Sequence, residues 1–241
     1  MIPRLGDAPD APFPPPAQAL QEPDGLLAWG GDLSPGRLLR AYARGIFPWY
    51  SEDDPILWWC PQQRCVIKTG AVHVSRRLHR QLRSGAWHVT ADLAFGQVVS
   101  GCATARPSTW IIPEMIEAYE ELHRLGFAHS IEVWDQETLI GGLYGVALGR
   151  MFFGESMYSA RSNASKVVLV ELCRVLEHWG FSWMDCQVPN PHLFRMGAER
   201  IERAEFLAGV RHRVSQYEEP GPWTRRFNES LEALGGGSAA S

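Results

Sequence analysis

Apolar residues recur at helical spacing in three stretches of the chain, each bounded by residues typical of helix ends. The first stretch follows Ser34 and runs from Pro35 to a stop at Gly45. The second occupies residues 113–126, and the third extends from the N-cap candidate Asn163 to Gly180. Serine and asparagine suit the N-cap, proline the first helical position and glycine the residue after the last turn. We therefore predict a helix in each stretch, and a further helical, polar region at 200–230.

Four stretches with the alternation and residue types of strands lie at 130–134, 138–146, 150–157 and 181–188. The first three are joined by short turns, which is typical of an antiparallel meander. A helix separates the third strand from the fourth, and such a crossover unit is right-handed and joins parallel strands. We therefore predict an α/β (α+β) fold with a mixed sheet flanked by helices, in which strands 150–157 and 181–188 are neighbours.

The two ends of the chain differ from the middle in composition. Seven of the 17 prolines fall within residues 1–23, so we expect an extended arm that is a peripheral strap or partly disordered. Residues 235–241 are glycine, serine and alanine, which is typical of a flexible tail. No apolar run approaches the roughly 20 residues of a membrane helix, and the chain does not start with a secretory signal. These features favour a cytoplasmic protein without a membrane segment.

Charge is segregated along the chain although the net charge is only -4. Residues 55–91 contain no acid and carry a charge of +6, so the remainder carries -10. After the cap candidate Ser75, Arg76, Arg80 and Arg83 fall on one helix face, with Arg77 beside them. A solvated helix face would explain such a run, but no interleaved carboxylate relieves the repulsion. The segment therefore favours a polyanionic partner, for which the guanidinium fork is well suited.

Ten tryptophans are more than packing alone requires, and three of them, Trp49, Trp58 and Trp59, lie within eleven positions. Trp58 or Trp59 suits a small hydrophobic core. Trp49 lies in a proline-broken loop near the basic segment, and a flat exposed ring there could stack on a nucleobase. Trp110, in another loop, is its candidate companion.

Candidate chemistry lies late in the strand 181–188, where alternation would place Asp185 and Gln187 on one face and Cys186 on the other. Both polar groups could simply face water at a strand end. However, Glu155 lies near the end of the expected parallel neighbour, where ligands often collect. A carboxylate beside a carboxamide could orient an amine, relay its proton and stabilise an oxyanion, as acyl transfer without a covalent enzyme intermediate requires.

Other chemical patterns are weaker. Cys186 could be a nucleophile if His192 approached it, although alternation turns it away from Asp185. Five cysteines without a repeated spacing favour reduced thiols, and Cys60, Cys65, His73 and His79 match no common zinc pattern, so we expect no metal site. Dinucleotide and phosphate-loop fingerprints are absent from the sequence.

Five strings in the chain resemble the bacterial leucyl/phenylalanyl-tRNA-protein transferases, in the same order from about Phe13 to Phe206. They are Leu26 to Arg64 (LLAWGGDLSPGRLLRAYARGIFPWYSEDDPILWWCPQQR), HSIEVW at 129–134, GGLYGVALGRMFFGESMYS at 141–159, NASK at 163–166 and DCQVPN at 185–190. The resemblance implies a small N-terminal domain with its proline-rich arm at 1–62, a catalytic domain similar to GNAT acetyltransferases at 63–234, and the tail at 235–241. It also implies transfer of Leu or Phe, less often Met, from tRNA to a protein N-terminal Arg or Lys, which creates a degradation signal.

The resemblance also implies roles for individual residues. Asp185, Gln187 and Glu155 would be catalytic, and Trp49 and Trp110 would flank the terminal adenosine. Leu143, Phe152 and Phe153 would line the aminoacyl pocket, and Arg76, Arg77, Arg80 and Arg83 would face the tRNA. We expect no cofactor, because the tRNA ester is already activated, and a monomer whose partners are aminoacyl-tRNA and the acceptor protein. Two alternatives remain at this stage: a non-catalytic RNA-binding module and a coenzyme A dependent acetyltransferase.

Overall fold

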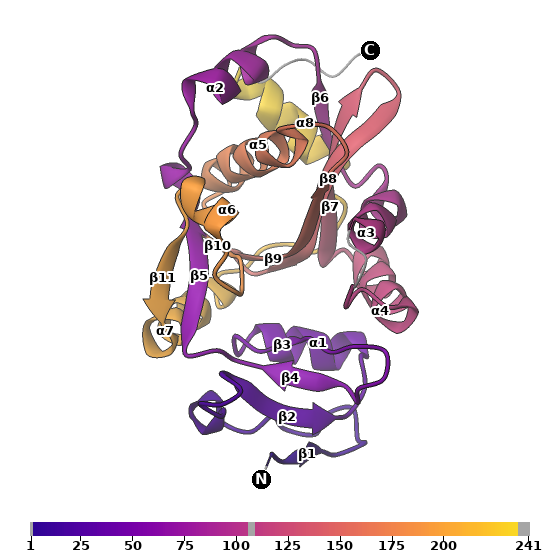
Figure 1. Ribbon diagram of the computed structural model, residues 1–241, viewed down its shortest axis with the longest axis vertical. Helices are drawn as coiled ribbons and strands as arrows, with labels where there is room; N and C mark the ends of the chain where they lie inside the picture. The colour runs from indigo at the N-terminus through magenta and orange to yellow at the C-terminus, as the bar shows by residue number, and fades with distance from the viewer. Residues whose placement is uncertain (1, 106–108, 236–241) are drawn as a thin grey trace.

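The computed structural model describes residues 2–105 and 109–235, and within these ranges the strands form two sheets (Figure 1). The smaller sheet has the order β1-β2-β4-β3 and comes from the N-terminal part of the chain. Its strands are β1 (Arg4–Leu5), β2 (Leu26–Gly30), β3 (Phe47–Pro48) and β4 (Leu57–Trp59).

The larger sheet has the order β11-β5-β10-β9-β8-β7-β6. Of its described strand pairs only β9 and β10 are parallel, so the sheet is mixed. Its strands are β5 (Gln63–Lys68), β6 (His88–Ala91), β7 (Ala128–Asp135), β8 (Thr138–Leu148), β9 (Met151–Ser159), β10 (Trp183–Asp185) and β11 (Glu199–Glu202).

Helices cover both faces of the larger sheet, with α5 and α8 on one side and α3 and α4 on the other (Figure 1). Helix α1 lies between the two sheets, and α7 follows the edge strand β11. The α-helices are α1 (Pro35–Tyr42), α2 (Arg76–Arg83), α3 (Phe95–Thr104), α4 (Pro113–Arg124), α5 (Ala164–His178), α6 (Pro191–Arg195), α7 (Arg203–Val214) and α8 (Thr224–Ala233). Short 3-10 turns occur at Pro16–Gln18 and Thr69–Ala71.

The α/β (α+β) class with a mixed sheet flanked by helices is confirmed. The three main helices, the meander β7-β8-β9 and the parallel pair β9 and β10 lie where the pattern predicts them. The strand predicted at 181–188 is wrong in extent, because β10 ends at Asp185 and Gln187 adopts a positive φ of 59°. At Asn163, which precedes α5, the side chain makes no capping bond, so only the helix start is as predicted.

The N-terminal arm is a strap packed on the small sheet. Strand β1 pairs in parallel with β2, and the side chains of Leu5 and Phe13 are buried. The ring of Phe13 meets Trp58 edge-on at 4.9 Å between centroids. Of the predicted flexible tail at 235–241, residues 236–241 lie outside the described residues.

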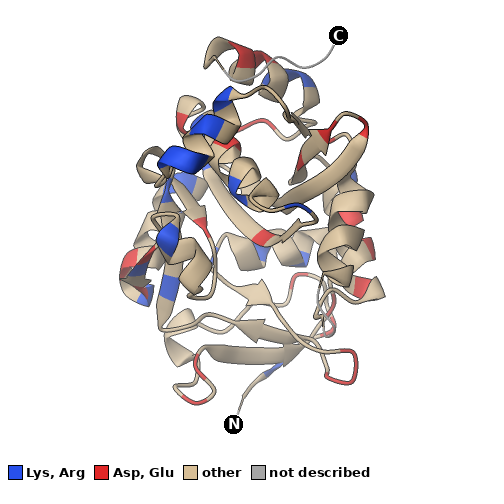
Figure 2. Ribbon diagram, turned by 45° about the horizontal axis from the view of Figure 1, so that its top comes forward, with Lys and Arg blue, Asp and Glu red and all other residues tan. Residues whose placement is uncertain are grey.

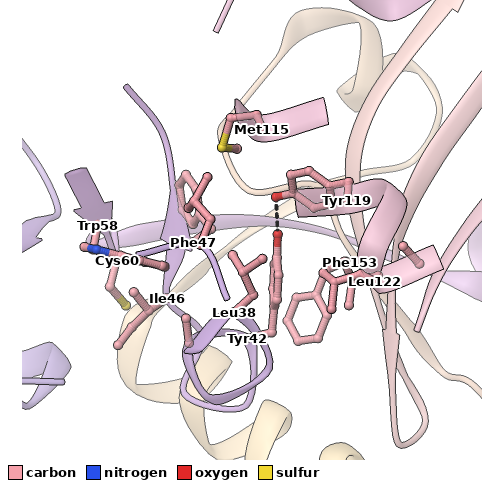
Figure 3. Packing of buried hydrophobic residues seen from close by; sticks show 14 of the residues in the cluster. Leu38, Tyr42, Ile46, Phe47, Trp58, Cys60, Met115, Tyr119, Leu122 and Phe153 are labelled. Carbon is pink, nitrogen blue, oxygen red and sulfur yellow. Dashed lines mark hydrogen bonds between the residues drawn. The ribbon is translucent and has the colours of Figure 1, made fainter. Parts of the chain in front are cut away.

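One hydrophobic core joins the small sheet to a face of the large one. The cluster contains Leu38 and Tyr42 of α1, Trp58 of β4, Tyr119 of α4 and Phe153 of β9 (Figure 3). A second cluster lies on the opposite face, around α5 and α8. The two parts of the chain therefore share buried side chains, and the boundary that we predict near residue 62 separates two sheets rather than two cores.

Candidate active site

A cavity of about 330 Å³ lies beyond the end of β10 and beside the middle of β9, and Trp49 in the loop that follows β3 lines it. Its polar lining includes Glu155, Ser156, Gln187 and Asn190. Its apolar lining includes Leu143, Met157, Leu169, Met184, Trp49 and Trp110. A mostly apolar hollow with a few convergent polar groups is the usual form of a small-ligand site.

Glu155 lies at the centre of a buried hydrogen-bond network that joins three elements. Its Oε1 accepts from the Tyr42 hydroxyl and from Gln187 Nε2, both at 2.8 Å. Its Oε2 accepts from the Tyr119 hydroxyl at 2.8 Å, and the two tyrosine hydroxyls lie 2.5 Å apart (Figure 3). Helices α1 and α4 thus hold a carboxyl group that β9 brings to the cavity.

Burial raises the pKa of Glu155 to about 7, although the hydrogen bonds from Tyr42, Tyr119 and Gln187 lower it in part. The number of protons available to the network agrees with a raised pKa for Glu155. Three oxygen contacts close a ring through Tyr42, Tyr119 and Glu155, and the two hydroxyls supply only two protons. A proton on Glu155 would complete the ring, so the site can hold or release one proton near neutral pH.

Asp185 does not line the cavity, although we expect it to share a face with Gln187. Its carboxylate is completely buried and binds Arg64 through two hydrogen bonds of 2.9 and 2.7 Å. Arg64 also donates to Gly45 O at 2.9 Å, and its guanidinium lies 4.5 Å from the centre of the Phe206 ring. Asp185 Oδ1 accepts in turn from the backbone N–H of Gln187 at 2.9 Å. The carboxylate therefore fixes the backbone that carries Gln187.

Cys186 lines the cavity together with Gln187. It packs against the cluster around α5, on the face opposite to the Asp185–Arg64 pair, as strand alternation predicts. A hydrogen bond with the Cys65 thiol, followed by burial, raises the pKa of Cys186 well above its usual value. A thiol in that state is a poor nucleophile.

The structure brings some of the predicted aromatic and apolar residues to the cavity and leaves others away from it. Trp49, Trp110 and Leu143 line the cavity, and 43% of the Trp49 surface is exposed. Phe152 and Phe153 do not line it, which corrects their predicted position. They are completely buried on opposite faces of the large sheet, Phe152 beside Trp223 and Phe153 beside Tyr42. Strand alternation then leaves Gly154 and Glu155, rather than the two phenylalanines, at the cavity.

Helix α2 forms the basic surface that the sequence predicts. Ser75 Oγ accepts from Leu78 N, Leu78 is buried, and Arg76, Arg77, Arg80 and Arg83 are exposed. In the described part of the chain none of these four arginines pairs with a carboxylate. Figure 2 shows the cationic residues gathered on this helix. We call Arg76, Arg77, Arg80 and Arg83 the α2 arginines.

Sequence reasoning missed three residues of the network: Arg64, Tyr42 and Tyr119. Each looks ordinary in the sequence, where Arg64 belongs to a basic stretch and the tyrosines to apolar helix faces. Their roles depend on contacts between segments 36 to 121 positions apart. No local pattern carries that information.

A metal site and a membrane-spanning helix each place requirements on the described residues. No group of three or more His, Cys, Asp or Glu side chains in residues 2–105 and 109–235 could hold a metal ion. In the same ranges no helix has the length and apolar character needed to span a bilayer.

The mixed α/β fold and the enclosed acid–amide pair define the chain as an enzyme candidate, and comparisons with known proteins give its class. The model of the leucyl/phenylalanyl-tRNA protein transferase family matches residues 66–211, and the model of that family's N-terminal domain matches residues 31–62. The protein is an aminoacyltransferase. It belongs to the leucyl/phenylalanyl-tRNA–protein transferase family.

Curated relatives support this assignment over nearly the full chain. A leucyl/phenylalanyl-tRNA–protein transferase of Xanthomonas oryzae pv. oryzae (strain MAFF 311018) is 57% identical over 229 residues, which cover 93% of this chain and 92% of the relative. One from Alkalilimnicola ehrlichii is 54% identical over 230 residues, covering 94% and 88%. Among solved structures FemX has a TM-score of 0.44 at 10% identity, covering 70% of this chain and 66% of FemX.

Proposed function

We propose that the protein transfers Leu or Phe, and less often Met, from aminoacyl-tRNA to the N-terminal Arg or Lys of acceptor proteins. The product would carry a new N-terminal residue that marks it for degradation. We propose that it acts as a monomer in the cytoplasm, where aminoacyl-tRNA is made and used. The single observation that supports this most is the Gln187–Glu155 pair at the end of an apolar cavity flanked by Trp49 and Trp110.

The cavity suits an aminoacyl side chain esterified to a terminal adenosine. Leu143, Met157, Leu169 and Met184 provide an apolar lining in which a charged side chain would lose its hydration without compensation. Trp49 and Trp110 line the same cavity, and a tryptophan face contributes about 1–3 kcal/mol when a base stacks on it. The same residues would thus select Leu, Phe or Met and hold the adenosine.

Glu155 and Gln187 would carry out the proton chemistry. Among the described residues no donor reaches Gln187 Oε1, which can therefore accept an N–H of the incoming α-amine. An amide oxygen is too weakly basic to keep a proton, whereas Glu155 has a pKa of about 7 and lines the cavity. We assign proton acceptance to Glu155 and alignment of the amine to Gln187.

The proposed step balances without a covalent enzyme intermediate. The amine nitrogen attacks the ester carbonyl carbon while one amine proton passes to Glu155. The new N–C bond remains, the ester C–O bond breaks, and the proton returns to the departing ribose oxygen. Because the ester is already activated, alignment and proton transfer are the protein's main contributions.

Asp185 would act as a positioning residue in this scheme. It contacts Arg64 and the Gln187 backbone, and it does not line the cavity. Its removal would therefore release Gln187 from the geometry that aligns the amine. This differs from the sequence expectation that Asp185 is itself a catalytic residue beside Gln187.

A transfer assay tests the proposal directly. The protein is incubated with labelled Leu-tRNA and a peptide beginning with Arg, and the label in the peptide is measured against a peptide beginning with Glu. We expect label only in the Arg peptide. Binding of Leu-tRNA without any transfer would instead support an RNA-binding module, and acetylation of the peptide by acetyl-CoA would support an acetyltransferase.

A further inference from the structure

A second cavity adjoins the candidate active site and has a different chemical character. It measures about 670 Å³ and shares Phe47, Trp49, Val188 and Pro189 with the first cavity. Val188 and Pro189 directly follow Gln187 in the chain. We call this second cavity the β11 groove, because Arg200 and Glu202 of β11 line it.

Two carboxylates that line the β11 groove, Asp24 and Glu202, each accept a hydrogen bond from the segment that joins β4 to β5 or from β5 itself. Asp24 Oδ1 accepts from the backbone N–H of Gln62 at 3.0 Å, and Glu202 Oε1 accepts from Gln63 Nε2 at 3.3 Å. Because Gln62 and Gln63 are consecutive, the two carboxylates are anchored at neighbouring points. Each has its second oxygen left for a ligand, and in the described part of the chain neither forms an ion pair.

Arg200, the arginine that lines the groove, already contacts an aromatic ring. The guanidinium of Arg200 lies 5.0 Å from the centre of the Phe194 ring. The carboxylates Asp24 and Glu202 therefore outnumber the single arginine, and the groove carries a net negative formal charge. Such a groove repels phosphates and attracts a cationic group.

The groove lies on the side of the active site away from the α2 arginines. In Figure 1 helix α2 is at the top, β11 is at the left near mid-height, and β4 and the rest of the small sheet are at the bottom. A tRNA held on the α2 arginines would reach the first cavity from above. The β11 groove is then the entrance that remains for the second substrate.

We propose that the β11 groove holds the basic N-terminal residue of the acceptor, with Asp24 and Glu202 pairing with its guanidinium or ammonium group. This assignment rests on the proposed function and names the place where the acceptor binds. A side chain seated there would leave the α-amine at the Val188–Pro189 edge, next to Gln187. The groove volume lies within the ~300–1,000 Å³ of ligand pockets and allows more than one acceptor residue to enter.

The test compares Asp24→Asn/Glu202→Gln with the control Asp10→Asn/Glu205→Gln. Both variants lose two exposed carboxylates, but Asp10 and Glu205 lie outside the groove. With an Arg-starting peptide, we expect the groove variant to raise KM by about three- to tenfold, as two exposed ion pairs would allow. Its kcat and its Kd for Leu-tRNA should equal those of the control, and its KM should respond less to added salt.

Argininamide provides a second readout, since it should inhibit wild-type transfer competitively with the peptide and inhibit the groove variant less. Equal KM values in the groove and control variants would overturn the assignment, as would a changed Kd for Leu-tRNA in the groove variant alone. Wild-type protein in the same assay separates the two proposals. If it transfers nothing, the proposed function fails, whereas normal wild-type transfer with an unaffected groove variant rejects the groove alone.

Discussion

At the scale of single residues, the buried carboxyl of Glu155 links function to pH. If Glu155 accepts the amine proton, kcat/KM should fall as pH drops below about 7, where the carboxyl becomes protonated. Glu155→Gln should lower kcat by about 10²- to 10⁴-fold and abolish this acidic limb. Single-turnover transfer rates between pH 5.5 and 8.5 check this. A limb that persists in the variant would assign the titration to another group.

Titration of Glu155 should also change the free energy of unfolding, which should fall as pH rises, whereas kcat/KM should rise. The folded pKa of Glu155, about 7, is above its usual value of 4.5, so folding favours the protonated form. That contribution is fully present below pH 4.5 and is lost as pH rises through 7. Glu155→Gln should therefore match or exceed wild-type stability at pH 8, by up to about 3 kcal/mol, and the difference should vanish at low pH. Urea unfolding at pH 4.5 and pH 8 measures it.

Removing one partner of the buried Arg64–Asp185 pair should strongly lower the free energy of unfolding. Arg64→Met would leave Asp185 charged and unpaired in the interior, which typically costs about 3–5 kcal/mol. Lys68→Met on the same strand is the matched control, because its pair with Glu199 is exposed and should contribute no more than about 1 kcal/mol. Denaturant midpoints of the two variants compare them. Equal losses would mean that Arg64 does not compensate the buried carboxylate.

Cys186 also bears on the mechanism, because it lines the cavity and carries a thiol. Its raised pKa and its bond to Cys65 predict that it is not a nucleophile. Cys186→Ala should retain transfer within a few-fold of wild type, and no aminoacyl-thioester should form. Loss of transfer together with a trapped thioester in wild type would reverse this conclusion.

At the scale of elements, helix α2 follows directly from the sequence. Ser75 caps it, Leu78 points inward and the α2 arginines stay in solvent, as the spacing predicts. Arg80→Glu should weaken Leu-tRNA binding and reduce the slope of log K against log salt by about one or more, with kcat unchanged at saturation. Arg124→Glu on α4, also an exposed reversal, is the control. Equal salt slopes for the two variants would remove α2 from the tRNA surface.

Local sequence patterns predict an element well where the residues of that element alone determine its conformation and its bounds. Helices α1 and α4, which both begin at a proline, and the meander of β7 to β9 are of this kind. The end of β10 is not, because Gln187 leaves the strand where Asp185 accepts its N–H and Arg64 anchors Asp185 from β5. The backbone turn at Gln187 therefore depends on a partner of Asp185 that lies 121 positions away, which a local pattern cannot anticipate.

At the scale of the whole molecule, the shared core predicts cooperative unfolding. Tyr42 of α1 contacts both Tyr119 and Glu155, and Arg64 bonds to Gly45 O, so neither sheet keeps its buried groups without the other. Urea unfolding should show one transition by far-UV circular dichroism and by tryptophan fluorescence. Two separated transitions would indicate that residues 1–62 fold independently.

The composition of the site also depends on the whole molecule. The small sheet supplies Trp49 through the loop after β3, and the large sheet supplies Glu155 and Gln187. Sequence patterns could identify these residue types and, through resemblance to a family, their association. They could not show that Asp185 is sealed behind the site or that Phe152 and Phe153 lie in the core, because both facts depend on how the two sheets pack.

The most direct test of the account is the single-turnover rate of Leu transfer from a preformed Leu-tRNA complex to an Arg-starting peptide, compared between wild type and Gln187→Ala. The account predicts a fall of at least about 100-fold in the variant, with unchanged Kd for Leu-tRNA and unchanged urea stability. A rate within a few-fold of wild type would contradict the claim that transfer takes place at the Gln187–Glu155 pair.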